Sequence, residues 1–256
     1  MNCRSEIIIA EPRTYRSFND DGGFVSFRVV VDTSDLYIKA LCNLEDVARA
    51  LVIECRSQIE DAIRRRPKFL TSFNPIDKDN LDSATPLRMI EASAKAGVGP
   101  MAAVAGAVAE FVGRNLLKFS EEVVIENGGD IFVHVKRPIV IGIHAGASPF
   151  SDKLGIKIGP TIIPIGICTS SAKIGPSINL GNADGATVMS YDVGLADAVA
   201  TGLGNRIKGA LDLQSALEWA TSVDGVVAAL AIVQDKLAVS GAIELVPTGS
   251  QLSQYP

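Results

Sequence analysis

The chain has 256 residues, of which 47% are hydrophobic and 5% aromatic, and a formal net charge of −5 at pH 7. This composition can build a large core, while the acidic charge argues against a sequence-independent nucleic-acid binder, which needs a surplus of lysine and arginine. Four scattered cysteines favour a reducing compartment, and we see no signal-peptide pattern or membrane-spanning apolar run, so we expect a cytoplasmic protein that does not bind membranes.

The first part of the chain predicts two strands and a long amphipathic helix. Alternating apolar residues indicate the strands, and apolar residues spaced three and four apart indicate the helix. These elements are strands at 25–31 and 36–41 and a helix at 43–63. Cys55 lies on the apolar face of that helix, and we expect Cys55 and Cys42 to be core thiols. A polar loop at 73–84 is the best candidate for a linker or a flap.

The middle of the chain predicts two helices followed by a run of strands. The second of these helices is so rich in alanine and glycine that another backbone, or a flat ligand, can approach it closely. The predicted elements are helices at 85–96 and 100–118 and strands at 123–126, 131–135, 139–143, 154–158 and 162–167. An Asn-Gly-Gly-Asp turn joins the first two of these strands.

The last part of the chain alternates strand-like and helical segments. The predicted elements are a strand at 186–189, helices at 193–203 and 213–222, an apolar segment at 226–233 and a strand at 243–246. Together with the preceding segments they predict an α+β fold with a mostly antiparallel sheet and helices packed on it. We expect one domain, 1–256, with an N-terminal half at 1–84 and a motif-bearing half at 85–256.

The helix at 193–203 contains a single charge in an apolar run of small residues. Asp197 and Thr201 are four residues apart, so a helix places both on one face. An unpaired buried carboxylate is costly and needs a partner. A hard cation, held by the carboxylate and the hydroxyl, is one candidate partner. An arginine or backbone N–H groups are the alternative.

Three further segments bring glycine, hydroxyl or thiol groups to the ends of predicted elements. They are Gly97 and Gly99 before the second alanine-rich helix, the turn Asn127, Gly128, Gly129 and Asp130, and Cys168, Thr169, Ser170 and Ser171 after a strand. The first could receive a phosphate at a helix N-terminus, with an inter-helix turn as the alternative. The second could be only a hairpin turn and the third an ordinary polar loop.

The candidates for acid–base or thiol chemistry are His144 and Cys168. His144 begins a loop and is a better candidate base than His134, which lies within a predicted strand. Cys168 lies at a predicted strand end that faces a ligand. The sequence contains no G-x-S-x-G, H-E-x-x-H or P-loop motif, which excludes the common hydrolase, zincin and P-loop patterns.

The order of these segments resembles the ApbE family of FAD:protein FMN transferases. The resemblance covers about residues 97–204 and is most specific at Leu-Ala-Asp-Ala-Val-Ala-Thr, residues 195–201. It implies a T-fold-like arrangement, Mg2+ at Asp197 and Thr201, and FAD or FMN near the Gly97–Gly99, Asn127–Asp130 and Thr169–Ser171 segments. It also implies a nucleotide ligand and a protein acceptor; a homo-oligomer is compatible with it.

Two segments of the family pattern have no counterpart in this chain. The family's H-x-I-D-P-x-T-G segment is replaced by K-I-G-P-S-I-N-L-G-N-A-D-G, and the lysine of the glycine-rich helix is absent. The chain is therefore more similar to a divergent prokaryotic branch of ApbE-like proteins. Two alternatives to flavin transfer follow: a sulfur-assimilation or sulfide-delivery protein that uses Cys168, and a non-catalytic binding module on the same fold.

Overall fold

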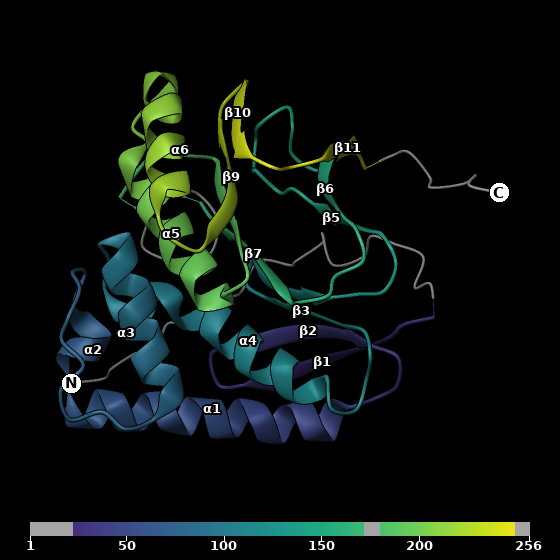
Figure 1. Ribbon diagram of the computed structural model, residues 1–256, viewed down its shortest axis with the longest axis vertical. Helices are drawn as coiled ribbons and strands as arrows, with labels where there is room; N and C mark the ends of the chain where they lie inside the picture. Colours follow the sequence, from purple (N-terminus) through teal and green to yellow (C-terminus); the bar gives the residue numbers. More distant parts are fainter. Residues whose placement is uncertain (1–22, 172–179, 249–256) are drawn as a thin grey trace, which may run out of the picture.

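Two antiparallel sheets organise the protein, whose computed structural model describes residues 23–171 and 180–248 (Figure 1). The larger sheet has eight strands in the order β1-β2-β3-β4-β7-β8-β9-β10, and the smaller has the order β11-β6-β5. The strands are β1 (Val25–Val31), β2 (Ser34–Ala40), β3 (Val123–Asn127), β4 (Asp130–His134), β5 (Ile139–Gly142), β6 (Leu154–Ile158), β7 (Ile165–Ser170), β8 (Gly185–Ser190), β9 (Val226–Val233), β10 (Lys236–Gly241) and β11 (Leu245–Pro247). The predicted α+β fold with a mostly antiparallel sheet is confirmed.

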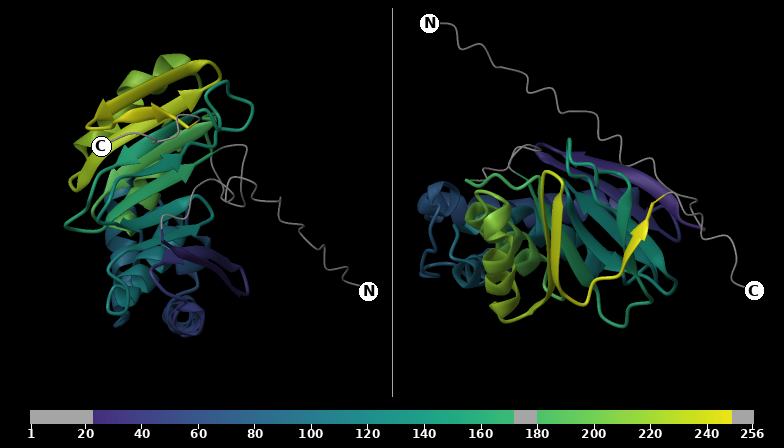
Figure 2. Two further views of the ribbon diagram at one scale, coloured as in Figure 1. Left: turned by 90° about the vertical axis from the view of Figure 1, so that its right-hand side faces the viewer. Right: turned by 90° about the horizontal axis from the view of Figure 1, so that it is seen from above.

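Helices cover one face of the eight-stranded sheet, and the small sheet covers the other (Figure 2). Going across the sheet, α1 packs over β1, α4 over β3 and β4, α5 over β7 and β8, and α6 over β9 and β10, while α3 lies against α5. The helices are α1 (Glu45–Arg65), α2 (Lys68–Thr71), α3 (Ala84–Ala96), η2 (Pro100–Ala103), α4 (Val104–Leu116), α5 (Val193–Arg206), η3 (Ala210–Asp212) and α6 (Leu213–Ser222). Each face of the sheet therefore has its own apolar core.

Local sequence pattern accounts well for the N-terminal elements. Every second residue of β2 is buried, which is the pattern of a strand with one face against the core. The buried positions of α1 recur at intervals of three and four residues, as its apolar face predicts: Ala48, Val52, Cys55, Ile59 and Ala62. The carboxamide oxygen of Asn43 accepts the Glu45 N–H at 2.9 Å and so satisfies a backbone donor at the start of this helix.

The hairpin between β3 and β4 confirms the predicted Asn-Gly-Gly-Asp turn. Asn127 pairs with Asp130 across the hairpin, and the two central glycines have φ values of 71° and 106°. Positive φ at both central positions is the requirement of a type I′ turn, which glycine meets without steric strain. The turn places Asp130 at the first position of β4.

Three sequence predictions differ from the structure. The strand predicted at 162–167 is found at Ile165–Ser170 as β7, because Pro164 has no N–H for the ladder, and Ile162 is 97% exposed. The apolar segment at 226–233 is strand β9, which forms a hairpin with the unpredicted β10. Cys42 is exposed rather than in the core, whereas Cys55 is buried as predicted.

Strand pairing joins the two predicted halves of the chain, because β2 of the first half lies beside β3 of the second. The division into halves at residue 84 stays a prediction. No single described helix is long and apolar enough to cross a membrane; α3 and η2–α4 meet that test of length and composition only together, across a bend of 102°.

Candidate functional site

Three acidic or thiol side chains meet where α5 crosses the sheet. Asp130 begins β4, Cys168 lies directly opposite it on β7, and Asp197 faces them from α5. All three are buried, with exposed fractions of 7%, 0% and 9%. We call Asp130, Cys168 and Asp197 the acidic junction. It unites three residues that sequence analysis had placed in separate candidate segments.

The electrostatics of the acidic junction are those of crowded, poorly solvated acids. The pKa of Asp130 is raised to about 7, chiefly by burial; the hydrogen bond from Cys168 opposes this rise, the Glu126 charge adds to it, and the backbone bond from Thr169 opposes it. Burial and the Asp130 charge raise the pKa of Asp197 well above its ordinary value. A neighbouring carboxylate charge that raises the pKa of Asp197 disfavours the state in which both acids are ionised.

The Asp197 carboxylate is bonded to the first turn of α4. Its Oδ2 accepts the Gly106 N–H at 2.9 Å, and a backbone bond from Ala105 also lowers its pKa. These N–H groups lack intrahelical partners at a helix N-terminus, so Asp197 caps α4 from another helix. Backbone N–H groups, one of the two partners that the sequence left open, are thus present.

The β3–β4 turn is also tied to α4 and to β7. The Asn127 side chain donates to the Ala105 carbonyl at 3.0 Å, and the Gly129 N–H donates to Glu126 Oε1 at 3.1 Å. The Gly129 carbonyl accepts the Thr169 N–H at 3.3 Å. The Asn127–Asp130 and Thr169–Ser171 segments therefore lie side by side next to the acidic junction.

The hydroxyl candidates have different surroundings. Thr169 Oγ1 lies 2.9 Å from Thr187 Oγ1 on β8, while Ser170 and Ser171 are buried at the end of β7. Thr201 is buried one helical turn beyond Asp197. A carboxylate and a hydroxyl on one helix face are hard oxygen donors of the kind that Mg2+ accepts. Among residues 23–171 and 180–248, no three His, Cys, Asp or Glu side chains form a metal-binding group.

The predicted thiol candidate is enclosed. Cys168 Sγ lies 3.5 Å from the Val193 carbonyl, to which it donates, and it also faces Asp130. Burial and the charges of Asp130 and Asp197 raise the pKa of this thiol well above its ordinary value. The thiol is therefore protonated at neutral pH, and thiolate chemistry is disfavoured in this arrangement.

The structure gives Gly97 and Gly99 packing functions at the end of α3. Gly97 has a φ of 70° and forms the C-cap of α3, where it and Val98 bond back to the last turn. A Cβ at Gly99 would lie 1.7 Å from the Ser72 carbonyl oxygen, so only glycine fits there. Their predicted contact with a ligand stays a prediction.

His144 lies outside the acidic junction, on the loop after β5. Its Nδ1 is 3.1 Å from both carboxylate oxygens of Asp152, and the imidazole is about one third exposed. The neighbouring Ala145 lies near Gly185 at the start of β8, next to Thr169 on β7. The structure thus holds His144 in an Asp–His pair on the small-sheet side.

Sequence analysis missed two residues of this region. Gly106 was one of many small residues in a helix, but a Cβ there would lie 2.4 Å from the Val193 carbonyl oxygen and 2.8 Å from Asp197 Cβ. Glu126 is 8% exposed on β3 and acts on the Asp130 pKa. A sequence signal that could have identified Gly106 is its spacing of four residues from Glu110, which matches the spacing of Val193 and Asp197 in the neighbouring helix.

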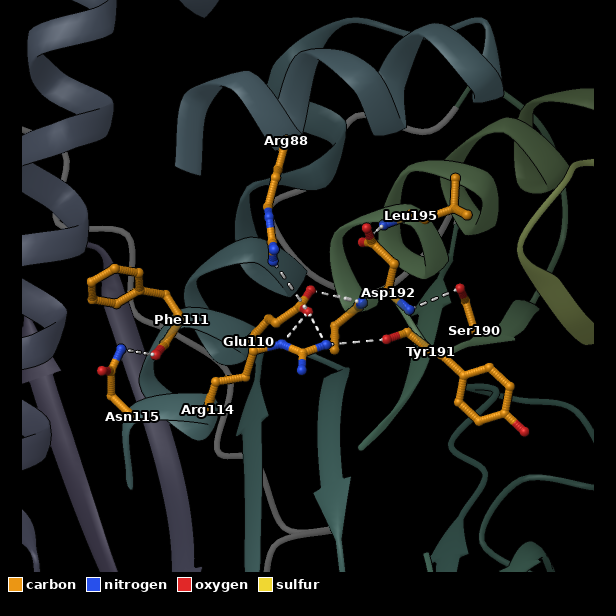
Figure 3. A network of polar contacts seen from close by, with 10 residues as sticks. Arg88, Glu110, Phe111, Arg114, Asn115, Ser190, Tyr191, Asp192 and Leu195 are labelled. Carbon is orange, nitrogen blue, oxygen red and sulfur yellow. Dashed lines mark hydrogen bonds and ion pairs between the residues drawn. The ribbon is translucent and has the colours of Figure 1, made fainter. Parts of the chain in front are cut away.

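A second buried carboxylate links the same two helices one turn away (Figure 3). Glu110 on α4 accepts the Val193 N–H through Oε2 at 3.0 Å. Its Oε1 accepts the Arg114 Nε–H at 2.6 Å and forms an ion pair with Arg114 Nη2, also at 2.6 Å. Arg88 of α3 reaches the same carboxylate at 3.7 Å. These side chains border a cavity of about 190 Å³ between α3, α4 and the start of α5, and none of the residues predicted for the site lines it.

Comparison with known proteins gives concordant results from sequence and from structure. The family model described as AbpE bacteria matches residues 16–238. A UPF0280 protein of Methanocella arvoryzae is 41% identical over 194 residues, covering 74% of this chain and 78% of that protein, and one of Methanothrix thermoacetophila is 40% identical over 201 residues, covering 77% and 84%.

Solved structures of similar fold include two flavin transferases. The flavin transferase ApbE from Vibrio cholerae has a TM-score of 0.57 at 13% identity and covers 85% of this chain and 96% of its own. The apo form of Pseudomonas stutzeri flavinyl transferase ApbE has a TM-score of 0.54 at 12% identity and covers 85% and 93%. At these identities the similarity establishes the fold.

Proposed function

The chain belongs to the family described as AbpE bacteria, and from this premise we propose that it binds a flavin nucleotide together with Mg2+ at the acidic junction. Solved proteins of similar fold are named flavin transferases. Binding of a flavin and a cation by this chain is our proposal, and the side chains that the fold assembles around Asp197 support it.

The observation that carries the proposal is the pair of buried acids, Asp130 and Asp197. Burial and neighbouring acids raise the pKa values of both residues. The hydrogen bonds that lower these pKa values come from a thiol and from backbone N–H groups. Such a pair is stabilised by a cation, because a positive charge between two carboxylates offsets both burial and mutual repulsion. Mg2+ in proteins is commonly held by one or two carboxylates and completed by substrate phosphates.

Each segment of the site has a separate role in this proposal. Asp197 and Thr201 provide oxygen donors for Mg2+, and Asp130 places a second carboxylate beside them; the cation, when bound, would offset the charge of a diphosphate. The Gly128–Gly129 backbone allows a ligand to approach the start of β4, and the hydroxyls of Thr169, Ser170 and Ser171 lie on the adjacent strand end. Hydroxyls and backbone N–H groups there can bind phosphate oxygens.

Calorimetric titration of FAD into the purified protein, with and without Mg2+, tests the proposal. We expect FAD to bind in the presence of Mg2+ and to lose most of its affinity in EDTA. Asp197→Asn should abolish the Mg2+ dependence. Glu122→Gln is the matched control. Glu122 is also a buried carboxylate, but it lies directly before β3, at the end of that strand away from the Asn127–Asp130 turn.

The outcomes separate the parts of the proposal. Absence of FAD binding with Mg2+ would overturn it, whereas binding that ignores both Mg2+ and Asp197→Asn would overturn the cation site alone. FMN and AMP, titrated separately, identify which part of FAD is recognised.

Flavin transfer to a protein acceptor is the finer proposal and needs its own assay. Incubation of the protein with FAD, Mg2+ and a hydroxyl-bearing acceptor protein should release AMP and leave fluorescent, covalently flavinylated acceptor. FAD binding without transfer would favour the binding module. The sulfur alternative lacks support in the described residues, because Cys168 is buried and protonated. A cytoplasmic location and a homo-oligomer stay predictions.

A further inference from the structure

Two reciprocal contacts connect α4 and α5. Asp197 of α5 accepts the Gly106 N–H at the start of α4, and Glu110 of α4 accepts the Val193 N–H at the start of α5. In each helix the two residues are four apart and therefore share a face. Each helix thus caps the N-terminus of its neighbour with a buried carboxylate.

The spacing between the helices makes the two contacts dependent on one another. Gly106 allows α4 to approach so closely that a Cβ there would lie 2.4 Å from the Val193 carbonyl oxygen. Within α5, Val193 lies one turn before Asp197, so a shift of Val193 moves the Asp197 carboxylate with it. Interiors are close-packed and transmit such displacements.

The Glu110 end is anchored by charge, as Figure 3 shows. Glu110 is 5% exposed, and Arg114 donates to it from the next turn of α4. Arg114 Nη2 also donates to the Tyr191 carbonyl at 3.4 Å. Arg114 therefore holds both Glu110 and the chain that leads into α5. A charge-assisted bond of this kind is shorter and stronger than a neutral one.

We propose that Glu110, held by Arg114, is a positioning residue that sets the Asp197 carboxylate opposite Asp130 in the acidic junction. The inference rests on the proposed function for its consequence, since a misplaced Asp197 would bind Mg2+ and FAD more weakly. Its structural content, the dependence of the Asp197–Gly106 contact on Glu110, can be measured without any ligand. Glu110 is not itself a ligand of Mg2+ or FAD in this proposal.

The test compares Glu110→Gln with Glu122→Gln. Both residues are buried glutamates that accept a backbone N–H and pair with an arginine, Arg114 for Glu110 and Arg137 for Glu122. Hydrogen exchange of the Gly106 amide is followed in the ligand-free proteins, and the Mg2+ dependence of FAD binding in the holo form. Arg114→Gln is the second variant, since it releases Glu110 without changing it.

The expected result is faster Gly106 exchange in Glu110→Gln and Arg114→Gln, and Mg2+ affinity lower by on the order of 10-fold, with both quantities unchanged in Glu122→Gln. Equal effects of Glu110→Gln and Glu122→Gln would show a general loss of stability and overturn the inference, as would unchanged Gly106 exchange. If the wild-type protein fails to bind FAD with Mg2+, the proposed function fails, and Gly106 exchange still decides the positioning role.

Discussion

The two ends of the α4–α5 contact hold buried carboxylates in opposite electrostatic situations. Glu110 accepts a backbone N–H of the neighbouring helix and has Arg114 and Arg88 as counter-ions. Asp197 also accepts a backbone N–H of the neighbouring helix, but it faces Asp130, and its pKa is raised. The fold thus gives Glu110 arginine counter-ions, whereas it places a second acid, Asp130, beside Asp197.

This difference distinguishes a carboxylate whose charge the fold compensates from one whose charge it does not. A carboxylate with backbone and arginine partners is satisfied in the folded chain. A carboxylate whose nearest charges have its own sign destabilises the fold unless a cation or proton joins it. Perturbed acids of this second kind are candidates for function.

The largest expected effect comes from closing the space between the helices. Gly106→Ala places a methyl group against the Val193 backbone and Asp197, neither of which is a flexible side-chain end. We expect a loss of about 3 kcal/mol in unfolding free energy, measured by urea denaturation. Gly194→Ala is the control, because its Cβ would meet nothing closer than 3.5 Å; similar losses in both variants would contradict the close contact.

Removing each carboxylate charge should change stability in opposite directions. Without Mg2+ at about pH 8, Asp197→Asn should raise the unfolding free energy because it removes an acid that is unfavourable when ionised. Glu110→Gln should lower it by about 2 kcal/mol because it weakens charge-assisted bonds. Urea denaturation of both variants in EDTA measures this. Destabilisation of equal size in both would remove the contrast between the two ends.

The pH dependence of the ligand-free protein sharpens the comparison. Asp130 has a pKa of about 7 in the folded protein against an ordinary value of 3.8, so the folded state binds more protons between these values. Its contribution to stability is greatest below the lower value and is lost as the pH rises through about 7. The slope of unfolding free energy against pH should flatten in Asp130→Asn; an unchanged slope would place the titration elsewhere.

The smallest effect should come from the outer arginine. Arg88 is 61% exposed and lies 3.7 Å from Glu110, whereas Arg114 donates to it at 2.6 Å. Arg88→Gln should therefore change the unfolding free energy by only about 0.3 kcal/mol, and less at high salt. Arg114→Gln should cost clearly more in the same denaturation experiment. A reversed order would assign the anchoring of Glu110 to α3.

The sequence predicted those parts of the fold that depend on neighbouring residues. The buried face of α1 and the turn at Gly128 and Gly129 follow from local periodicity and from the conformational freedom of glycine. The predicted start of β7 was wrong. Ile162 and Ile163 are residues typical of strands, but they precede Pro164 and are exposed. Composition alone does not report which isoleucines reach a ladder.

The sequence identified the acidic residues of the candidate site but not the groups that they contact. Asp197 stood out as the single charge in a helix of small residues and Asp130 as part of the Asn-Gly-Gly-Asp turn, and the fold brings them together. Glu110 was not among the predicted site residues, and its partner Val193 lies 83 residues away. Which N–H group a buried carboxylate accepts depends on tertiary packing, so the contacts of Gly106 and Glu110 are known only from the structure.

The pairing of β2 with β3 has a consequence for the order of folding. The two strands enclose all of α1 to α4 in the chain between them, so their alignment closes a long loop and is entropically slow. We expect the helices and the β1–β2 and β3–β4 hairpins, which depend on local contacts, to form before this step. Asp130 lies on β4, Cys168 on β7 and Asp197 on α5, so the acidic junction cannot assemble until synthesis has passed α5.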